Sequence, residues 1–187
     1  MLNRLRKIWR SDRGVSAIEF ALLAPILSTL FIGCIEVTFK IWSTQKAEKL
    51  AVTMADVIAQ SQNVSKADID ALTGSVDKIM DPFPFGLNGA VYITSVYRAQ
   101  DETVAKVNWQ CPHVGNLEVE SKIGEKGDDA VLPSGFTLAE RDNVIVAEVF
   151  YKYEPIAPGV LFDEQVIYRR AMFKPRLGAL TTPPTGC

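Results

Sequence analysis

Hydrophobic residues form one long run near the N-terminus of the chain. No charged residue occurs from Phe20 to Ile35, and counting back to Val15 gives 21 residues that contain a single charge, Glu19. As an α-helix this segment is about 31 Å long, close to the hydrocarbon thickness of a bilayer. The pattern therefore predicts a transmembrane helix over residues 15–36.

The helical period continues beyond the apolar run. Apolar residues recur at steps of three and four, which predicts one helix from Val15 to about Gln60. We expect the second half of this helix to pack on a folded domain through a single apolar stripe. The stripe consists of Ala47, Leu50, Ala51, Met54, Val57 and Ile58.

A second helix is predicted over residues 66–80. Ser65 and Asp68 resemble an N-cap pair that opens this helix, and the Pro- and Phe-rich stretch 82–86 ends it.

From about residue 90 the period of the apolar residues changes to two, which predicts strands. The Gly-, Asp- and Lys-rich residues 112–141 are expected to form mostly a surface connection. The predicted fold class is α+β, with the long N-terminal helix packed on an antiparallel sheet of about four strands, as in a pilin. The strands are predicted at 90–99, 103–111, 143–153 and 165–173, and on the second of them Ala105, Val107, Trp109 and Cys111 share one face.

Positive charge is concentrated ahead of the apolar run. Residues 1–14 contain five basic residues and one acidic residue, whereas the rest of the chain has 15 basic and 21 acidic residues. Under the positive-inside rule this arrangement keeps the N-terminus in the cytoplasm and exports residues 37–187. The sequence pI of about 5.5 argues against a nucleic-acid-binding protein, which would usually present a basic face.

Glu19 does not suit a simple membrane anchor. A carboxylate at the centre of a membrane helix costs about 2.5–3.5 kcal/mol, and near the interface the cost is lower but still favours a partner. One interpretation places Glu19 in the headgroup layer without a role. The other interpretation is that a neighbouring chain supplies a positive charge to it.

The residues around Glu19 form a recognisable motif. The stretch RGVSAIEFALLAPIL begins at Arg13 and holds Gly14, Glu19, Phe20 and Pro25 in register. It resembles the type III signal of type IV pilins, in which a basic leader ends in Gly and Glu is the fifth residue after the cut. More specifically, it is similar to the TadE/TadF-type pseudopilins, the minor pilins of the tight-adherence (Flp) type IV pilus system.

This resemblance implies a processing site and a set of partners. A prepilin peptidase would cut between Gly14 and Val15, which removes the leader 1–14 and makes Glu19 the fifth mature residue. The new α-amino group of Val15 would then pair with Glu19 of a neighbouring subunit, next to Phe20 in the assembly segment. The implied partners are the peptidase, other pilins, the inner-membrane assembly platform and membrane lipid.

The implied function is that of a structural pilus subunit. It would cross the bacterial inner membrane once, with a cytoplasmic N-terminus and a periplasmic C-terminal domain, and the sequence leaves open whether it enters the surface pilus. The alternative is an uncleaved single-pass anchor whose periplasmic domain binds a partner, with Gly14 and Glu19 coincidental.

The three cysteines fall into two groups. Cys34 lies in the apolar run and is expected to be a small buried residue. Cys111 and Cys187 lie in the exported part, where an oxidising compartment would let them form a disulfide; two free thiols are the alternative.

No arrangement of residues in the sequence indicates catalysis. The single histidine, His113, lacks the second histidine or CxxC pair that would support a metal site. A GxSxG nucleophile motif does not occur, and the acidic residues between 118 and 129 lack the spacing of an EF-hand. We therefore expect no enzyme activity, no metal and no cofactor.

Overall fold

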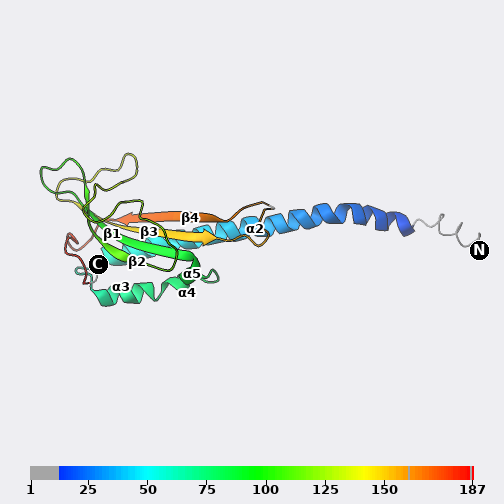
Figure 1. Cartoon of the computed structure of the whole chain (residues 1–187), viewed down its shortest axis with the longest axis horizontal. Coiled ribbons are helices and arrows are strands. Elements are labelled where there is room, and N and C mark those ends of the chain that lie inside the picture. Colours follow the sequence, from blue (N-terminus) through cyan, green and yellow to red (C-terminus); the bar gives the residue numbers. More distant parts are fainter. Residues whose placement is uncertain (1–12, 160, 186) are drawn as a thin grey trace, which may run out of the picture. The chain divides into compact units, whose positions relative to one another are not determined.

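The computed structural model describes residues 13–159, 161–185 and 187, and Figure 1 labels the elements. Within these residues, helices α2 to α5 are followed along the chain by strands β1 to β4. The chain divides into two compact units. The first contains the chain up to Phe39 together with Pro155–Asp163, and the second contains Lys40–Glu154 with Glu164–Cys187. The predicted α+β class is confirmed.

Helix α2, Arg13–Ala59, has 47 residues and ends one residue before the predicted end at Gln60. Pro25 lies inside it, where proline lacks the backbone N–H of the helical ladder. The helix nevertheless continues through Pro25, and the Thr29 hydroxyl donates a hydrogen bond to the Pro25 carbonyl oxygen at 2.9 Å.

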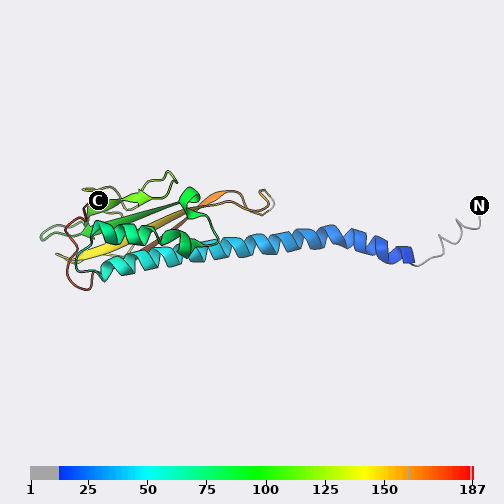
Figure 2. The same cartoon turned by 90° about the horizontal axis from the view of Figure 1, so that it is seen from below.

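The part of α2 that belongs to the second unit buries an apolar stripe. The predicted member Val57 is 41% exposed, so its assignment to the stripe is wrong, whereas the other predicted members are buried. Each large side chain buried in this way stabilises the fold by about 1.5–3 kcal/mol. In Figure 2 this part of α2, coloured cyan, lies next to α3 and the sheet. The buried stripe consists of Ala47, Leu50, Ala51, Met54, Ala55, Ile58 and Ala59.

The segment predicted as one helix over 66–80 forms two helices, α3, Lys66–Thr73, and α4, Val76–Met80. The predicted N-cap is present, because Ser65 and Asp68 form a reciprocal capping box. The break follows from Ser75, whose hydroxyl donates to the Leu72 carbonyl oxygen at 2.6 Å and so competes with the helical ladder. A further single turn, α5, spans Phe85–Asn88.

The sheet has the strand order β2-β1-β3-β4, and each neighbouring pair is antiparallel. Strands β3, Asn143–Tyr153, and β4, Gln165–Phe173, have the bounds predicted from the sequence. Strand β4 forms one edge of the sheet and β2 forms the other. The outer edge of β2 is bonded by the following connection, since Val107 exchanges two backbone hydrogen bonds with residues 127 and 128.

The first two strands are displaced from their predicted positions. Strand β1 is Gly89–Tyr97 rather than 90–99, and β2 is Lys106–Val114 rather than 103–111. The turn between them is longer than predicted. The Arg98 side chain stabilises it by donating to the Glu102 carbonyl oxygen within the turn and to the Leu138 carbonyl oxygen of the later connection, at 2.7 Å each.

A β-bulge in β2 changes which face its residues occupy. Ser95 pairs with Trp109, whereas the next residue, Val96, pairs with Val107. Paired residues point to the same face, so Val107 and Trp109 point to opposite faces although they are two positions apart. The prediction of a single face is therefore wrong. The bulge separates the four residues into two pairs, Ala105 with Val107 and Trp109 with Cys111.

Residues 115–142 form mostly a surface connection, as the sequence predicts for 112–141, but two of their apolar side chains are buried. Ile123 and Leu138 are 0% and 3% exposed and pack in one cluster with Val96, Val144 and Val146. These valines alternate along the strands with the residues that face the helices, so the connection covers the other face of the sheet. The buried apolar residues of the connection are too widely spaced to show a period, so the sequence did not predict that the connection packs on the sheet.

A buried carboxylate holds this connection on the sheet. Glu148 of β3 is 0% exposed, and its Oε1 accepts hydrogen bonds from the Lys122 backbone N–H and the Tyr168 hydroxyl, both at 2.9 Å. The Ser121 hydroxyl donates to Oε2 of the same carboxylate. Burial and the nearby negative charge of Glu148 raise the pKa of Tyr168 above its ordinary value.

The C-terminal segment is fastened to the sheet at Leu180. The Asn143 side chain is buried; its Nδ2 donates to Ser95 Oγ at 2.7 Å and to the Val96 carbonyl oxygen at 2.9 Å. Its Oδ1 accepts from the Leu180 backbone N–H at 3.0 Å. The Leu180 carbonyl oxygen accepts from Trp109 Nε1 at 2.8 Å and from Ser95 Oγ at 2.9 Å.

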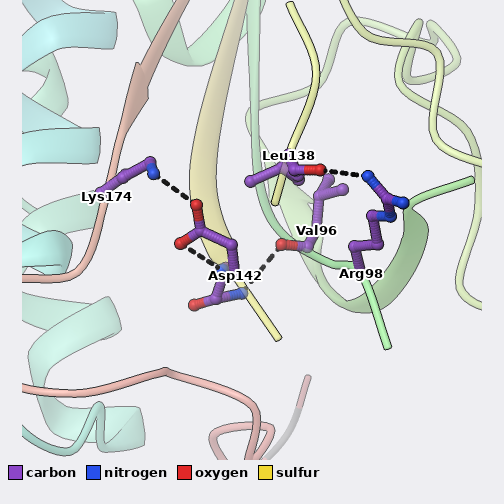
Figure 3. Close-up of polar contacts among 6 residues, drawn as sticks. Val96, Arg98, Leu138, Asp142 and Lys174 are labelled. Atoms are coloured by element: carbon purple, nitrogen blue, oxygen red, sulfur yellow. Dashed lines mark hydrogen bonds and ion pairs between the residues drawn. The ribbon is translucent and has the colours of Figure 1, made fainter. Parts of the chain in front are cut away.

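Charged side chains form contacts at the end of the sheet where β1 ends and β3 begins, as Figure 3 shows. Asp142, which precedes β3, forms an ion pair with Lys174, which follows β4. Arg98, which follows β1, donates from its Nη1 to the Leu138 carbonyl oxygen at 2.7 Å. Three strands and the long connection are therefore joined by polar contacts at this end.

Candidate membrane and assembly segment

The first unit presents an apolar helix surface. Among the described residues, α2 is the one helix that is long and apolar enough to cross a membrane. The large apolar side chains from Val15 to Phe31 are exposed, from 54% for Val15 to 69% for Leu22. A core helix of a soluble protein would bury such side chains, whereas lipid would surround them. The segment therefore fits a single-pass membrane anchor.

Gly14 and Val15 lie in the first turn of α2. A Cβ added at Gly14 would meet no atom within 4 Å, so the backbone is accessible there. The first amides of a helix have no acceptor within the helix, and glycine lowers helix stability by about 1 kcal/mol. This turn can therefore unwind at little cost in free energy. Most of the predicted leader, residues 1–12, lies outside the described residues.

Glu19 and Phe20 follow one turn later. Glu19 is four residues after Val15, so both lie on the same face of the helix, and the Phe20 side chain is 67% exposed. None of the ion pairs found in the described part of the chain involves Glu19. Between Val15 and Ile35 the helix thus carries one acid on an otherwise uncharged surface.

The cysteines give one agreement and one correction. Cys111 and Cys187 form a disulfide with an S–S distance of 2.02 Å, the pairing expected from the sequence. The free Cys34 is exposed, so the prediction that it is buried is wrong. The reason is that the apolar run to which it belongs forms helix surface rather than protein core.

The sequence analysis missed a contact at the end of the apolar run. Glu36 is 0% exposed, and its Oε1 accepts a hydrogen bond from the Ala157 backbone N–H at 2.6 Å. Next to it, Leu161 Cδ1 lies 3.0 Å from the position of a Cβ added at Gly33. Glu36 and Ala157 are 121 positions apart, so no local period reveals the contact. The available signal was the uncharged stretch of residues 155–162.

No catalytic arrangement emerges from the described residues. They contain no group of three or more His, Cys, Asp or Glu side chains that could hold a metal ion. The side chain of His113 lies outside the described part of the structure. The features that the structure brings together concern membrane insertion and helix packing.

Comparison with known proteins supports the same interpretation. A family model described as TadE-like protein matches residues 14–55, which begin at Gly14 and extend into the buried part of α2. Searches of curated proteins and of solved structures found no match. TadE-like proteins are structural pilus components, and the match suggests a Tad pilus-associated protein with an N-terminal membrane helix. Residues 14–55 are therefore similar to the TadE-like family, and this similarity is consistent with a TadE-like pilin of the Tad/Flp system.

Proposed function

We propose that the chain is a minor pilin or pseudopilin that helps to assemble a tight-adherence (Flp) pilus. The observation that carries this proposal is that the TadE-like match and the exposed apolar helix both begin at Gly14. The protein is made with the basic leader 1–14, which a prepilin peptidase removes by cutting between Gly14 and Val15. Figure 1 shows this end of α2 in dark blue.

Cleavage provides a partner for Glu19. The new α-amino group of Val15 is positive, and in the apolar phase it pairs with Glu19 of a neighbouring subunit. Each charge alone is costly in lipid, so the pair favours assembled over separate helices. Because the two groups are four residues apart on the helix, the pairing offsets neighbouring helices by about 6 Å.

The basic leader and the disulfide support one topology. Positive residues keep the N-terminus in the cytoplasm, and residues 37–187 lie in the periplasm. The Cys111–Cys187 disulfide suits that oxidising compartment. In this location the helix contacts membrane lipid and the other pilins, and the inner-membrane assembly platform acts on the assembled subunits.

The N-terminus of the membrane-extracted protein tests the proposal. We expect the mature chain to start at Val15 in cells that contain the peptidase and at Met1 in cells that lack it. Gly14→Leu should leave the chain starting at Met1, because a bulky side chain blocks the cleavage position. Ser16→Ala, two residues further on, is the matched control and should still give a start at Val15. A functional protein that starts at Met1 in normal cells would support the uncleaved anchor instead.

The role of Glu19 requires a separate measurement. Glu19→Gln keeps the size of the side chain but removes its charge, so membrane insertion should be unchanged while association with other pilins falls. Crosslinking from Ser28→Cys, an exposed position on the same helix, reports that association. Normal crosslinking in the Glu19→Gln chain would eliminate the proposed pairing.

A further inference from the structure

The loop between β3 and β4 has an unusual composition. Residues 155–162 contain no charged side chain, whereas Glu154 precedes them and Asp163 and Glu164 follow. Within the first unit, Ile156 is 63% exposed and Leu161 is 51% exposed. Exposed apolar side chains at the tip of a loop are costly in water, so their surroundings need an explanation.

We propose that this loop is a second membrane-contacting element, which places Ile156 and Leu161 among the phospholipid acyl chains beside α2. The inference rests on the proposed membrane location of α2. It adds a lipid-binding role to a loop whose Ala157 lies 121 positions after the helix residue that it contacts, Glu36.

Most backbone N–H groups at the start of the loop do not need water as a hydrogen-bond partner. Pro155 and Pro158 have no N–H group, and the Ala157 N–H is bonded to Glu36 Oε1 at 2.6 Å. The Gly159 N–H donates to the Phe162 carbonyl oxygen at 3.3 Å. Unbonded N–H groups exclude most irregular segments from lipid. Of the five residues 155–159, two are prolines without an N–H and two have a bonded N–H.

The position of the loop along α2 gives its depth. Leu161 lies against Gly33, three residues before Glu36, which is about 4.5 Å nearer the centre of the apolar run. Elements that lie in the membrane interface bury their apolar face by about 5–10 Å, so this depth corresponds to the boundary between headgroups and acyl chains.

An apolar groove continues from the loop along the helix. It has a volume of about 850 Å³ and is lined by one face of α2 from Pro25 to Thr38 and by Leu161. Most of its lining belongs to the 21-residue run that matches the bilayer thickness. Acyl chains therefore already surround this groove when the helix spans the membrane, and we assign them as its occupant.

The charges next to the loop do not oppose this position. Lys152 Nζ lies 3.2 Å from a carboxylate oxygen of Glu154 and 2.9 Å from one of Glu164. Two of the three flanking acids are therefore paired with a cation, and the polar residues form a boundary on both sides of the uncharged stretch.

Fluorescence quenching in vesicles tests the inference on the full chain. The background is Cys34→Ser, which leaves the disulfide as the remaining cysteine pair. An environment-sensitive fluorophore is attached to Ile156→Cys, to Leu23→Cys on α2, or to Val131→Cys. Val131 is the matched control, because its 62% exposure is close to the 63% of Ile156 and it belongs to the second unit. The vesicles contain phosphatidylethanolamine, phosphatidylglycerol and a brominated phosphatidylcholine, which quenches fluorophores located among acyl chains.

We expect quenching at positions 156 and 23 to be several-fold greater than at position 131. Strong quenching at 23 with quenching at 156 no greater than at 131 would overturn the loop inference and leave the proposed function intact. Weak quenching at all three positions would overturn the membrane location of α2, and with it both proposals.

A second variant tests the contact that holds the loop. Glu36→Ala removes the acceptor of the Ala157 N–H, so quenching at 156 should fall several-fold while quenching at 23 stays the same. Retention of the Cys111–Cys187 disulfide checks that the rest of the chain has folded. Unchanged quenching at 156 in this variant would show that Glu36 does not hold the loop in lipid.

Discussion

The polar contacts of Asn143 lead to a quantitative prediction for Asn143→Ala. The Asn143 side chain is 3% exposed and makes three hydrogen bonds, to Ser95, Val96 and Leu180. A typical hydrogen bond contributes about 0.5–1.5 kcal/mol, and a buried group left without its partner costs about 1–3 kcal/mol. The substitution leaves the Leu180 N–H without this acceptor, so we expect a total loss of about 3–5 kcal/mol. Folded domains are stable by about 5–15 kcal/mol, so such a loss is large.

Asn108→Ala provides the matched control. The Asn108 side chain holds the next residue of the same segment, because its Nδ2 donates to the Thr181 carbonyl oxygen at 2.6 Å. It is only partly buried and makes this one contact, so removing it should cost about 0.5–1.5 kcal/mol. Urea unfolding of the full chain in detergent, without reductant, measures both values through tryptophan fluorescence.

Amide hydrogen exchange at Leu180 gives an independent measurement. Asn143→Ala should accelerate this exchange, since the amide loses its acceptor, whereas Asn108→Ala should change it little. If Asn143→Ala destabilises the protein no more than Asn108→Ala, and Leu180 exchanges as slowly as before, Asn143 does not hold the C-terminal segment. The reasoning from buried hydrogen bonds would then be wrong here.

Three other substitutions have defined outcomes. The pKa of Tyr168 is raised by burial and by Glu148, so its stabilising contribution is complete below about pH 10 and is lost as the pH rises through the raised pKa. Tyr168→Phe should therefore remove part of the alkaline loss of Tm; an unchanged profile would contradict this. Hydrogen bonds from its capping-box partner lower the pKa of Asp68, so its contribution is present above about pH 4 and is lost on acidification. Asp68→Asn should flatten the dependence of Tm on pH in that acid range, and a dependence as steep as before would argue against the cap. Leu50→Ala in the fully buried stripe should cost about 2–5 kcal/mol in urea unfolding, whereas Val57→Ala, at a 41% exposed position, should cost far less. Equal losses for the two would contradict the observed stripe.

The sequence predicts well the elements that depend on a local period. Strands β3 and β4 have the predicted bounds because each is a strand-length stretch rich in β-branched and aromatic residues between polar or proline-containing ends. The length of α2 could be predicted for the same reason, since its apolar run and its buried stripe follow one helical period. The Ser65–Asp68 capping box is likewise a local motif of four residues.

The features that were missed depend on distant contacts. The bulge between Val107 and Trp109 arises from the register with β1, and the bare strand sequence shows only an uninterrupted alternation. A charged residue such as Glu148 would be expected on the exposed face of a strand. It is buried because residues 121 and 122 of the connection donate hydrogen bonds to its carboxylate.

The residues of the candidate membrane segment likewise include some that the sequence predicted and some that it did not. The motif from Gly14 to Phe20 is visible in the sequence because the enzyme and the neighbouring helices that it implies would recognise contiguous residues. The burial of Glu36 was not visible, because its hydrogen-bond donor comes from the loop after β3.

The two edges of the sheet have a consequence for how copies of the protein can associate. The outer edge of β2 already exchanges backbone bonds with its own chain, which leaves β4 as the edge where a strand of another molecule would add. Arg169 is the central residue of β4, so symmetric antiparallel pairing of two such strands would place the two guanidinium groups opposite each other. Repulsion between them disfavours a continuous intermolecular sheet and the aggregation that follows from it. Under the proposed function, assembly of copies would therefore depend on helix α2 rather than on the edge of the sheet.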